Sequence, residues 1–313
     1  MSDSIAALRR KIAGAGDLHA VVRTMKALAA SSISDYERSV LALAEYDRMV
    51  SLGLGECFRQ ARASPGSAAE QLRAGKSDPI DAIVFGSDQG LVGPFNDVIV
   101  EHAIGALANL PGRAQVWAIG ERVQARLLDA GLDVPGVYAV PNSVDAIAPL
   151  VAQIQIDREA RRAQDGPGQL RQVHVFHNRP LAASLYEPVG QRLLPLDAAW
   201  QQSLAAVPWP GTMGPEVLDH GATTLRALIG EYLFISLFRA CAESLASENA
   251  SRLAAMERAD RNIEGLLDHL HAKFHRLRQG SIDEELFDVT AGYEALAQPK
   301  VAGTRTQAAR DLR

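Results

Sequence analysis

Apolar residues recur at alternating steps of three and four at both ends of this chain, over roughly residues 3–57 and 219–296. This spacing keeps apolar side chains on one helix face and is typical of a coiled-coil seam. In the N-terminal segment only His19, Lys26 and Asp47 interrupt the stripe, and neither segment contains an internal proline. The N-terminal stripe is Ile5, Leu8, Ile12, Ala15, His19, Val22, Lys26, Ala29, Ile33, Tyr36, Val40, Leu43, Asp47 and Val50. The C-terminal stripe is Leu225, Leu228, Tyr232, Ile235, Arg239, Ala242, Ala246, Asn249, Leu253, Met256, Asp260, Ile263, Leu267, Leu270, Phe274, Leu277 and Ser281.

Two such helices at opposite ends of one chain predict an antiparallel shaft. At about 1.5 Å per residue the second helix would be roughly 90 to 110 Å long, several times the diameter of a small domain. Part of it should therefore lie outside the chain's own fold. An ordinary helical bundle is the alternative, but a bundle needs further helices of matching length, and the middle of the sequence offers none.

The middle of the chain has a different pattern, in which short apolar runs alternate with helix-like stretches. Strands that alternate with helices predict a mostly parallel, Rossmann-like sheet. The expected strands are 80–85, 115–119, 136–140, 173–176 and 191–196, and the expected helices are 97–110, 121–130 and 145–162. The predicted fold class is therefore α/β plus a long antiparallel coiled coil, with the N- and C-terminal helices as a shaft and the Rossmann-like domain at its base.

Composition shifts mark the expected boundaries. Small residues, proline and glycine accumulate between the first helix and the first strand, and the last residues lose apolar periodicity, which is typical of a disordered tail. The expected division is an N-terminal shaft helix over 1–58, a linker over 59–79, an α/β domain over 80–205, a linker over 206–218, a C-terminal shaft helix over 219–296 and a tail over 297–313.

Charge and composition disfavour several classes of protein. The net charge of −5 and a pI near 5.9 argue against nucleic-acid binding, which usually needs a basic excess. No apolar run approaches the roughly 18 residues that span a bilayer, and the N-terminus lacks the apolar core of a signal peptide. We therefore expect a cytosolic chain without direct membrane insertion, which partners could still attach to a membrane. Cys57 and Cys241 are expected to be reduced thiols.

The loop at 86–96, GSDQGLVGPFN, is the strongest local candidate for chemistry, because a glycine-rich turn after a first strand often binds phosphates. Its glycines have the spacing GxxxGxxG rather than GxGxxG, and Gly120 stands where an acidic residue would follow the second strand. The loop is therefore interpreted as a structural turn, with Asp88 as a turn or helix-capping residue.

Two further motifs imitate known sites. Residues 75–77, Gly-Lys-Ser, lack the earlier glycine and the preceding strand of a phosphate-binding loop. His271 and His275 are spaced as in zinc hydrolases, but Ala272 occupies the position of the catalytic glutamate. No nucleophile–base or paired-carboxylate arrangement can be nominated, so we expect no catalytic residues, no cofactor site and no metal site.

Several blocks of the sequence resemble the gamma subunit, the central rotor shaft, of F-type rotary ATP synthases. The resemblance covers essentially the whole chain, and its C-terminal part is the most specific. The blocks are LRRKIAGAGDLHAVVRTMKALAAS at 8–31, GSDQGLVGPFN at 86–96, ESLASENASRLAAMERADRNIEGLL at 243–267 and FHRLRQGSIDEELFDVTAGYEAL at 274–296.

The resemblance implies a non-catalytic subunit of an ion-transporting two-sector ATPase. Its expected partners are a hexamer of alpha and beta subunits, the epsilon subunit and the membrane c-ring, with no nucleic acid. Rotation would couple proton or sodium translocation to ATP synthesis or hydrolysis. The expected location is peripheral, at the cytoplasmic face of the bacterial cell membrane.

The resemblance also implies roles for single residues. Arg252 and Gln279 match polar shaft positions that contact the catch region of the beta subunit, and Met25 matches a shaft position near that arginine. An arginine supplies directional donors to carboxylates or carbonyls of the surrounding ring. The apolar C-terminal end, which includes Leu286 and Val289, is expected to turn against a bearing. If Met25 lies level with Arg252, Cys241 should lie near residue 36, roughly 30 Å from Cys57 and too far for a disulfide.

The sequence departs from the family pattern in places. Ser32, Ser34 and Asp35 stand where members commonly carry basic residues that face an acidic segment of the beta subunit. The stretch VPWPGTMGPE at 207–216 and the tail also differ. These features suggest a divergent paralogue from the alternate bacterial ATPases thought to pump sodium ions or protons.

Two other classes of protein were weighed. A nucleotide-dependent α/β enzyme with a coiled-coil arm, as in some tRNA synthetases, would need a catalytic motif and a basic RNA-binding face. A purely structural coiled-coil scaffold would explain the helices but not the matched central and C-terminal blocks.

Overall fold

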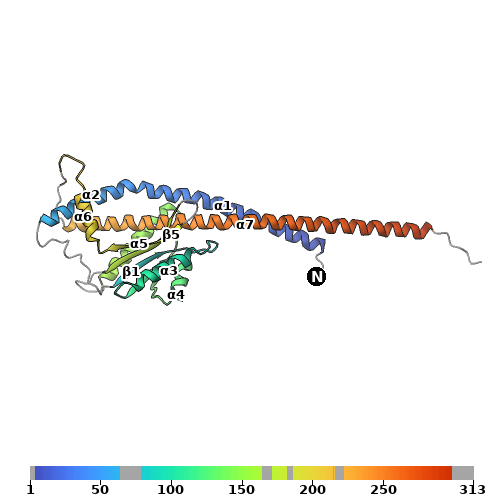
Figure 1. Ribbon diagram of the computed structural model, residues 1–313, viewed down its shortest axis with the longest axis horizontal. Helices are drawn as coiled ribbons and strands as arrows, with labels where there is room; N and C mark the ends of the chain where they lie inside the picture. The colour runs from blue at the N-terminus through green and yellow to red at the C-terminus, as the bar shows by residue number, and fades with distance from the viewer. Residues whose placement is uncertain are drawn as a thin grey trace, which may run out of the picture. The chain divides into compact units, whose positions relative to one another are not determined.

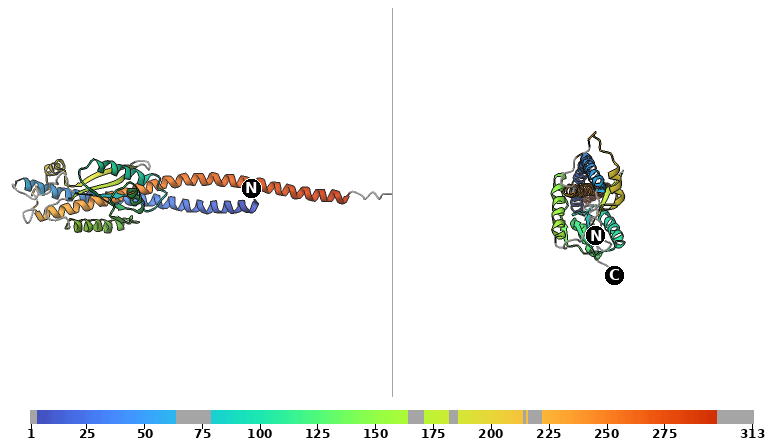
Figure 2. Two further views of the ribbon diagram at one scale, coloured as in Figure 1. Left: turned by 90° about the horizontal axis from the view of Figure 1, so that it is seen from below. Right: turned by 90° about the vertical axis from the view of Figure 1, so that its left-hand side faces the viewer.

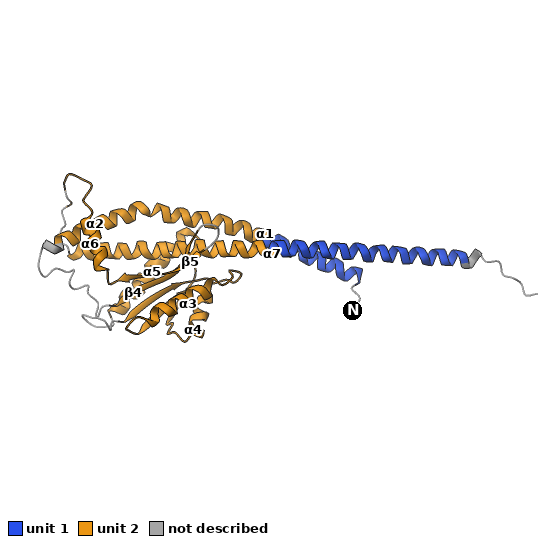
Figure 3. Ribbon diagram, in the orientation of Figure 1, with its two compact units in different colours: residues 1–22, 260–313 blue, residues 23–259 orange. Residues whose placement is uncertain are grey.

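The computed structural model divides the chain into two compact units (Figure 3). Unit 1 comprises residues 1–22 and 260–313, and unit 2 comprises residues 23–259. Two long helices contribute to both units. The described residues are 4–63, 79–163, 171–181, 186–213, 215 and 222–297.

The long terminal helices form as the apolar period predicts. The N-terminal segment consists of α1 (Ile5–Ala42) and α2 (Ala44–Ala63), and the C-terminal segment is α7 (Ala222–Ala297), an unbroken helix of 76 residues (Figure 1). A single continuous N-terminal helix was expected, but it is interrupted at Leu43, where the backbone N–H bonds to the Val40 carbonyl oxygen at 3.3 Å.

The structure describes only part of the predicted linkers. Helix α2 continues through Ala63, so the expected linker start at 59 was wrong. Residues 64–78 of that linker lie outside the described residues, and so does the predicted tail from 298 onward. Within the second expected linker, described residues 207–213 contain no helix or strand.

In unit 1 the helices α1 and α7 run antiparallel along an apolar seam. Leu8 and Ala15 of α1 are buried with Leu270 of α7. The guanidinium of Arg9 lies 5.5 Å from the ring centroid of Phe274. Residues early in α1 therefore meet residues late in α7, as the sequence predicts.

In unit 2 the same antiparallel order holds between α2 and α7. The Tyr46 hydroxyl donates to Glu231 at 2.6 Å, and Arg239 bonds to Asp47 at 2.6 Å. Asp47, one of the polar interruptions of the stripe, thus has an ionic partner on the facing helix.

A five-stranded sheet of order β3-β2-β1-β4-β5 forms the centre of unit 2. The first four strands pair parallel, and β5 pairs antiparallel with β4 at one edge. A mostly parallel sheet was predicted, and an antiparallel edge strand is common in such sheets. The strands are β1 (Ile80–Phe85), β2 (Ala114–Ile119), β3 (Gly136–Tyr138), β4 (Gln172–Pro180) and β5 (Tyr186–Leu194).

The sheet is covered on both faces, so β1 is buried along its whole length (Figures 1 and 2). Ile80, Ala82 and Val84 pack with α3 (Phe95–Ala108) and α4 (Glu121–Asp129). Ile83 and Phe85 point to the other face, because side chains alternate along a strand. There they share a core with α5 (Ile147–Arg162), which follows the 3₁₀ turn Val144–Ala146, and with α1, α2 and α7.

One helix of this unit had no counterpart in the sequence-based prediction. Helix α6 (Ala198–Ala206) begins at Asp197, whose carboxylate accepts the Ala199 N–H at 3.1 Å. It packs closely on α2 at Gly55, where an added Cβ would lie 2.5 Å from the Leu204 carbonyl oxygen. The α/β domain therefore packs against the N-terminal helices through α6, its last element, as well as through its sheet.

Candidate functional site

The loop between β1 and α3 is held by a short network of hydrogen bonds. The Ser87 N–H donates to Asn96 Oδ1 at 3.0 Å, and Asn96 Nδ2 donates back to Ser87 Oγ at 2.8 Å. Leu91 and Gly93 take left-handed backbone conformations, with φ of 63° and 59°. Gly86 cannot be replaced without movement, because a Cβ there would lie 2.3 Å from Val123 Cβ.

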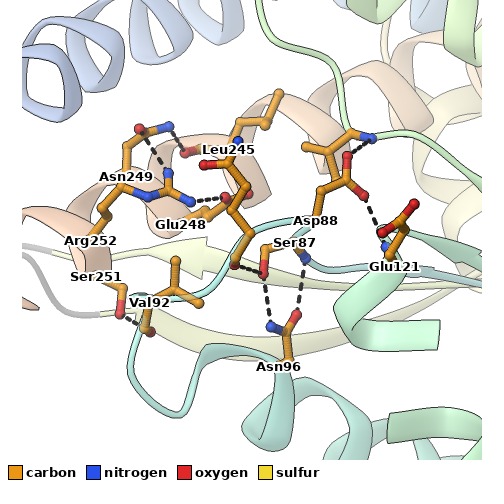
Figure 4. A network of polar contacts seen from close by, with 12 residues as sticks. Ser87, Asp88, Val92, Asn96, Glu121, Leu245, Glu248, Asn249, Ser251 and Arg252 are labelled. Atoms are coloured by element: carbon orange, nitrogen blue, oxygen red, sulfur yellow. Dashed lines mark hydrogen bonds and ion pairs between the residues drawn. The ribbon is translucent and has the colours of Figure 1, made fainter. Parts of the chain in front are cut away.

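Asp88 ties this loop to the neighbouring elements of the sheet (Figure 4). Its carboxylate accepts the Glu121 N–H at the start of α4 and the Val140 N–H just after β3, both at 2.9 Å. Asp88 was interpreted as a turn or helix-capping residue; it bonds to the first N–H of α4, and it does not cap α3, the helix that follows its own loop. A helix N-terminus after the second strand is where many α/β folds bind an anion, and here the chain's own carboxylate accepts one of its N–H groups.

Helix α7 is bonded to the same loop by buried serines. Ser251 Oγ donates to the Val92 carbonyl at 2.6 Å, and Ser247 Oγ donates to the Asn178 carbonyl at 2.9 Å. Asn178 Nδ2 in turn donates to the Phe95 carbonyl at 3.0 Å. We call this set, residues 86–96 with Asn178, Ser247, Glu248, Ser251 and Arg252, the loop–α7 joint. Figure 4 shows Glu248, Ser251 and Arg252 beside the loop.

A buried ion pair lies in the joint. Arg252 Nη2 bonds to Glu248 Oε1 at 2.6 Å, one turn earlier on α7, and the two side chains are only 13% and 6% exposed. Glu248 Oε2 and Arg252 Nε have no hydrogen-bond partner among the described residues. Burial raises the pKa of the Glu248 carboxyl, Arg252 opposes this effect, and the nearby charge of Asp88 adds to it. The net direction is upward because desolvation exceeds the single ion pair.

The ion pair lines a cavity of about 200 Å³ in unit 2. Ser32 and Tyr36 of α1 line it, together with Asp88 and Asn142. Burial also raises the pKa of the Tyr36 phenol. The cavity therefore places charged and neutral polar groups of α1, α7 and the β1–α3 loop around one small volume.

The three shaft residues singled out by the resemblance lie in different surroundings. Met25 is half-buried in α1, and Arg252 donates hydrogen bonds within α7, to Glu248 and weakly to Asn249 at 3.4 Å. Gln279 is exposed on the part of α7 that belongs to unit 1. Their contacts with a beta subunit stay predictions.

The departures from the family pattern have local partners. Asp35 forms an ion pair with Arg38 one turn later, and the Ser34 carbonyl accepts from Arg38 Nε at 3.2 Å. Ser32 lines the cavity beside the Glu248–Arg252 pair.

The structure describes one of the two motifs that imitate known sites. His271 and His275 are both exposed, and the Gly-Lys-Ser motif at 75–77 lies outside the described residues. Cys57 and Cys241 are free and buried, and burial raises the pKa of both thiols. Tyr36 and Cys241 belong to the same buried apolar core, in agreement with the predicted register.

The structure brings together one group that the sequence analysis missed. His19 of α1 faces Asp260 and Glu264 of α7, with His19 Nε2 at 2.8 Å from Asp260 Oδ1 and 3.9 Å from Glu264 Oε1. His19 and Asp260 are both polar interruptions of apolar stripes, which is the signal that could have paired them.

Large apolar side chains are exposed near the end of α7. They are Ile282, Leu286, Phe287, Val289 and Tyr293, which are 52% to 74% exposed. In the part of the chain that the structure describes, no helix is long and apolar enough to cross a membrane.

Comparisons with known proteins agree over nearly the full length. Residues 4–296 match the family model described as ATP synthase. The chain is 26% identical to the ATP synthase gamma chain of Anaeromyxobacter sp. (strain Fw109-5), over 94% of this chain and 99% of the relative. It is 27% identical to the ATP synthase gamma chain of Gluconobacter oxydans (strain 621H), again over 94% and 99% of the two chains.

Solved structures show the same fold. A chain of the Euglena gracilis mitochondrial ATP synthase, solved as OSCP, F1 and c-ring in rotational state 3, is similar with a TM-score of 0.60 at 16% identity, covering 98% of this chain and 99% of that chain. A chain of the central stalk and c-ring of the Tetrahymena thermophila mitochondrial ATP synthase has a TM-score of 0.52 at 21% identity, covering 76% and 99%. The paired terminal helices, the mostly parallel sheet and the full-length family match lead to one assignment: this chain belongs to the ATP synthase gamma-chain family.

Proposed function

We propose that this chain is the non-catalytic central-stalk subunit of a membrane-bound rotary ATP synthase or ATPase. It would couple proton or sodium translocation to ATP synthesis or hydrolysis in a hexamer of alpha and beta subunits. The single observation that carries the proposal is the antiparallel pairing of α1 and α2 with α7, an unbroken helix whose last turns expose large apolar side chains. Relatives named gamma chain and structures of F1, central stalk and c-ring support it.

The loop–α7 joint connects the α/β domain to α7 within unit 2. If torque acts on the α/β domain, it can be transmitted to α7 only through buried contacts that keep their geometry. Ser247 and Ser251 supply two such hydrogen bonds, and the apolar core shared by the sheet and α7 supplies the rest. We propose a division into a shaft formed by α1, α2 and α7 and a base domain that runs from β1 to α6 on the same grounds.

The residues that would contact the beta subunit are Met25, Arg252 and Gln279. Gln279 is exposed and can reach a partner as it stands. Arg252 is held by Glu248, so this carboxylate would set the direction in which the guanidinium presents its remaining donors.

The proposed partners are the alpha, beta and epsilon subunits and the c-ring. The proposed location is peripheral, at the cytoplasmic face of a bacterial cell membrane. The pairing of Asp35 with Arg38, where family members commonly carry basic residues, supports a divergent paralogue.

The test is a reconstitution with the partner subunits. The chain should co-purify with alpha, beta and epsilon subunits, and the complex should pump ions in vesicles when it hydrolyses ATP. In the double variant Arg252→Lys with Gln279→Ala, a positive charge stays beside Glu248, so we expect assembly to persist. We expect coupled pumping to fall several-fold, because lysine lacks the planar donors of arginine and directional hydrogen bonds contribute about 1 to 3 kcal/mol each when removed. Failure to co-purify would refute the central-stalk proposal, whereas unchanged pumping would refute only the roles of these two residues.

A further inference from the structure

The group formed by His19, Asp260 and Glu264 lies between two helices of unit 1 (Figure 3, blue). One ligand-type atom from each residue lies within 4.8 Å of the other two. The group contains one imidazole nitrogen and two carboxylate oxygens. This mixed donor set differs from an ordinary acidic surface cluster, because imidazole favours transition metals over the hard cations that carboxylates alone select.

The surroundings of the group are those of a partly closed site. His19 follows the seam between Ala15 and Val22, which are buried, and its own side chain is only 20% exposed. Asp260 is 14% exposed and stands one turn before buried Ile263. Glu264 is 60% exposed and provides a side open to water. A metal site needs both ordered ligands and such an entry path.

The distances fit a transition metal after small side-chain shifts. Zinc bonds to histidine nitrogen and carboxylate oxygen at about 2.0 to 2.2 Å, so tetrahedral ligand atoms lie about 3.3 Å apart. The separations of 2.8 Å from His19 Nε2 to Asp260 and 3.9 Å to Glu264 lie on either side of that value. Asp260 and Glu264 are four apart on α7, which places both carboxylates on one helix face toward α1.

We propose that His19, Asp260 and Glu264 form a site for a divalent transition metal ion, represented by Zn²⁺, that fastens α1 to α7 in unit 1. The ion would join three side chains from two helices and leave one coordination position to water. It would also compensate two carboxylates brought together at a seam that is otherwise apolar. The site would fix the register of the helix pair independently of the function in the rotary complex.

The competing explanation is that His19 and Asp260 form only an interhelical hydrogen bond. The two explanations differ in Glu264, which a hydrogen-bonded pair does not require and a metal site does. They differ also in the effect of His19→Gln, because glutamine can still hydrogen-bond to Asp260 but is a poor ligand for zinc.

The experiment measures Zn²⁺ binding to the purified, untagged full chain by isothermal titration calorimetry. The exposed pair His271 and His275 has i,i+4 spacing and could bind zinc by itself, so the reference chain carries His271→Gln and His275→Gln. We expect the reference chain to bind one Zn²⁺, and we expect His19→Gln and Glu264→Gln, each added to it, to weaken binding about tenfold or more. Zn²⁺ should raise the melting temperature of the reference chain, and Mg²⁺ should not.

Circular dichroism checks that each variant keeps its helix content. Glu264→Gln carries the test if His19→Gln disturbs folding, since Glu264 is mostly exposed. Loss of all zinc binding in the reference chain would overturn the proposal, because binding would then belong to His271 and His275. Binding that persists unchanged in both His19→Gln and Glu264→Gln would overturn it as well.

Discussion

Two carboxylates of the loop–α7 joint are stabilised to different degrees. Asp88 accepts two backbone N–H groups, so each of its carboxylate oxygens has a hydrogen-bond partner. Glu248 has one ionic partner and a second oxygen without a hydrogen-bond partner among the described residues. Burial of the incompletely hydrogen-bonded Glu248 carboxylate therefore reduces the stability of the fold, and the raised pKa of Glu248 makes this reduction depend on pH.

The raised pKa of Glu248 should make the free energy of unfolding decrease as the pH rises. The pKa of Glu248 is raised in the folded chain, so between its ordinary value of about 4.3 and the raised value the folded state holds a proton that the unfolded state has lost. Glu248 therefore lowers the free energy of unfolding as the pH rises through this window. We expect the difference in that free energy, wild type minus Glu248→Gln, to decrease between pH 4.5 and the raised pKa.

Urea unfolding of both chains at several pH values measures this difference. Glu264→Gln is the matched control, because it removes the same charged group from a mostly exposed position of the same helix. A difference for Glu248→Gln that increases with pH would show that Arg252 outweighs desolvation.

At the scale of elements, the apolar periodicity of a segment predicts features that depend on that segment alone, such as the buried face of a helix. The apolar stripes gave the correct faces of α1 and α7, since Leu8, Val22, Tyr36 and Leu270 are all buried. The turn at Leu43 was missed because no proline or clear change of period marks it. Helix α6 was missed although Asp197 caps its start and Pro208 follows its end. Its packing on α2 depends on the tertiary arrangement, which no local pattern reports.

The candidate site shows the same limit. Asp88 could be placed in a glycine-rich turn before α3, but not beside the N–H groups of Glu121 and Val140 to which it bonds. The partner of Ser251 could not be predicted either, since Val92 is joined to it only through the tertiary register. Contacts between residues of different elements can be predicted only when the alignment of those elements is known. The sequence indicates this alignment only where polar residues interrupt the apolar stripes of both helices.

The contact between α2 and α6 can be tested with a pair of glycines. Gly55→Ala places a Cβ 2.5 Å from the Leu204 carbonyl oxygen, a backbone atom that can move only with α6. Gly14→Ala in α1 meets nothing within 4 Å. We expect Gly14→Ala to stabilise the chain by about 0.5 to 1 kcal/mol through helix propensity, and Gly55→Ala to destabilise it despite the same gain.

Thermal and urea unfolding of the purified chain compare the two variants. Equal stabilisation by both would mean that α6 is not packed on Gly55 in solution.

At the scale of the whole molecule, burial and exposure separate what the chain needs for its own folding from what it offers to partners. Unit 1 buries Leu8, Ala15 and Leu270 between its helices, whereas the turns of α7 from Ile282 to Tyr293 expose their large apolar side chains. Exposed apolar side chains in such number mark an interaction surface. In the proposed complex this surface would turn inside the alpha and beta hexamer, where apolar contacts do not fix a single hydrogen-bonded orientation.

The last prediction separates these two roles. Leu286 and Phe287 are 64% and 73% exposed, so replacing both with glutamine should change the free energy of unfolding of the isolated chain by no more than about 0.5 kcal/mol per site. Leu270→Ala, at a buried seam position, should cost about 2 kcal/mol or more.

In the reconstituted complex we expect the opposite order of effects on coupling. The double glutamine variant should pump several-fold fewer ions per ATP hydrolysed than Leu270→Ala, because its polar groups would be desolvated against an apolar bearing. Urea unfolding and vesicle pumping assays give the two readouts. Strong destabilisation of the isolated chain by the glutamines would show that the end of α7 is packed within the chain itself, and unchanged pumping would show that it does not bear on the hexamer.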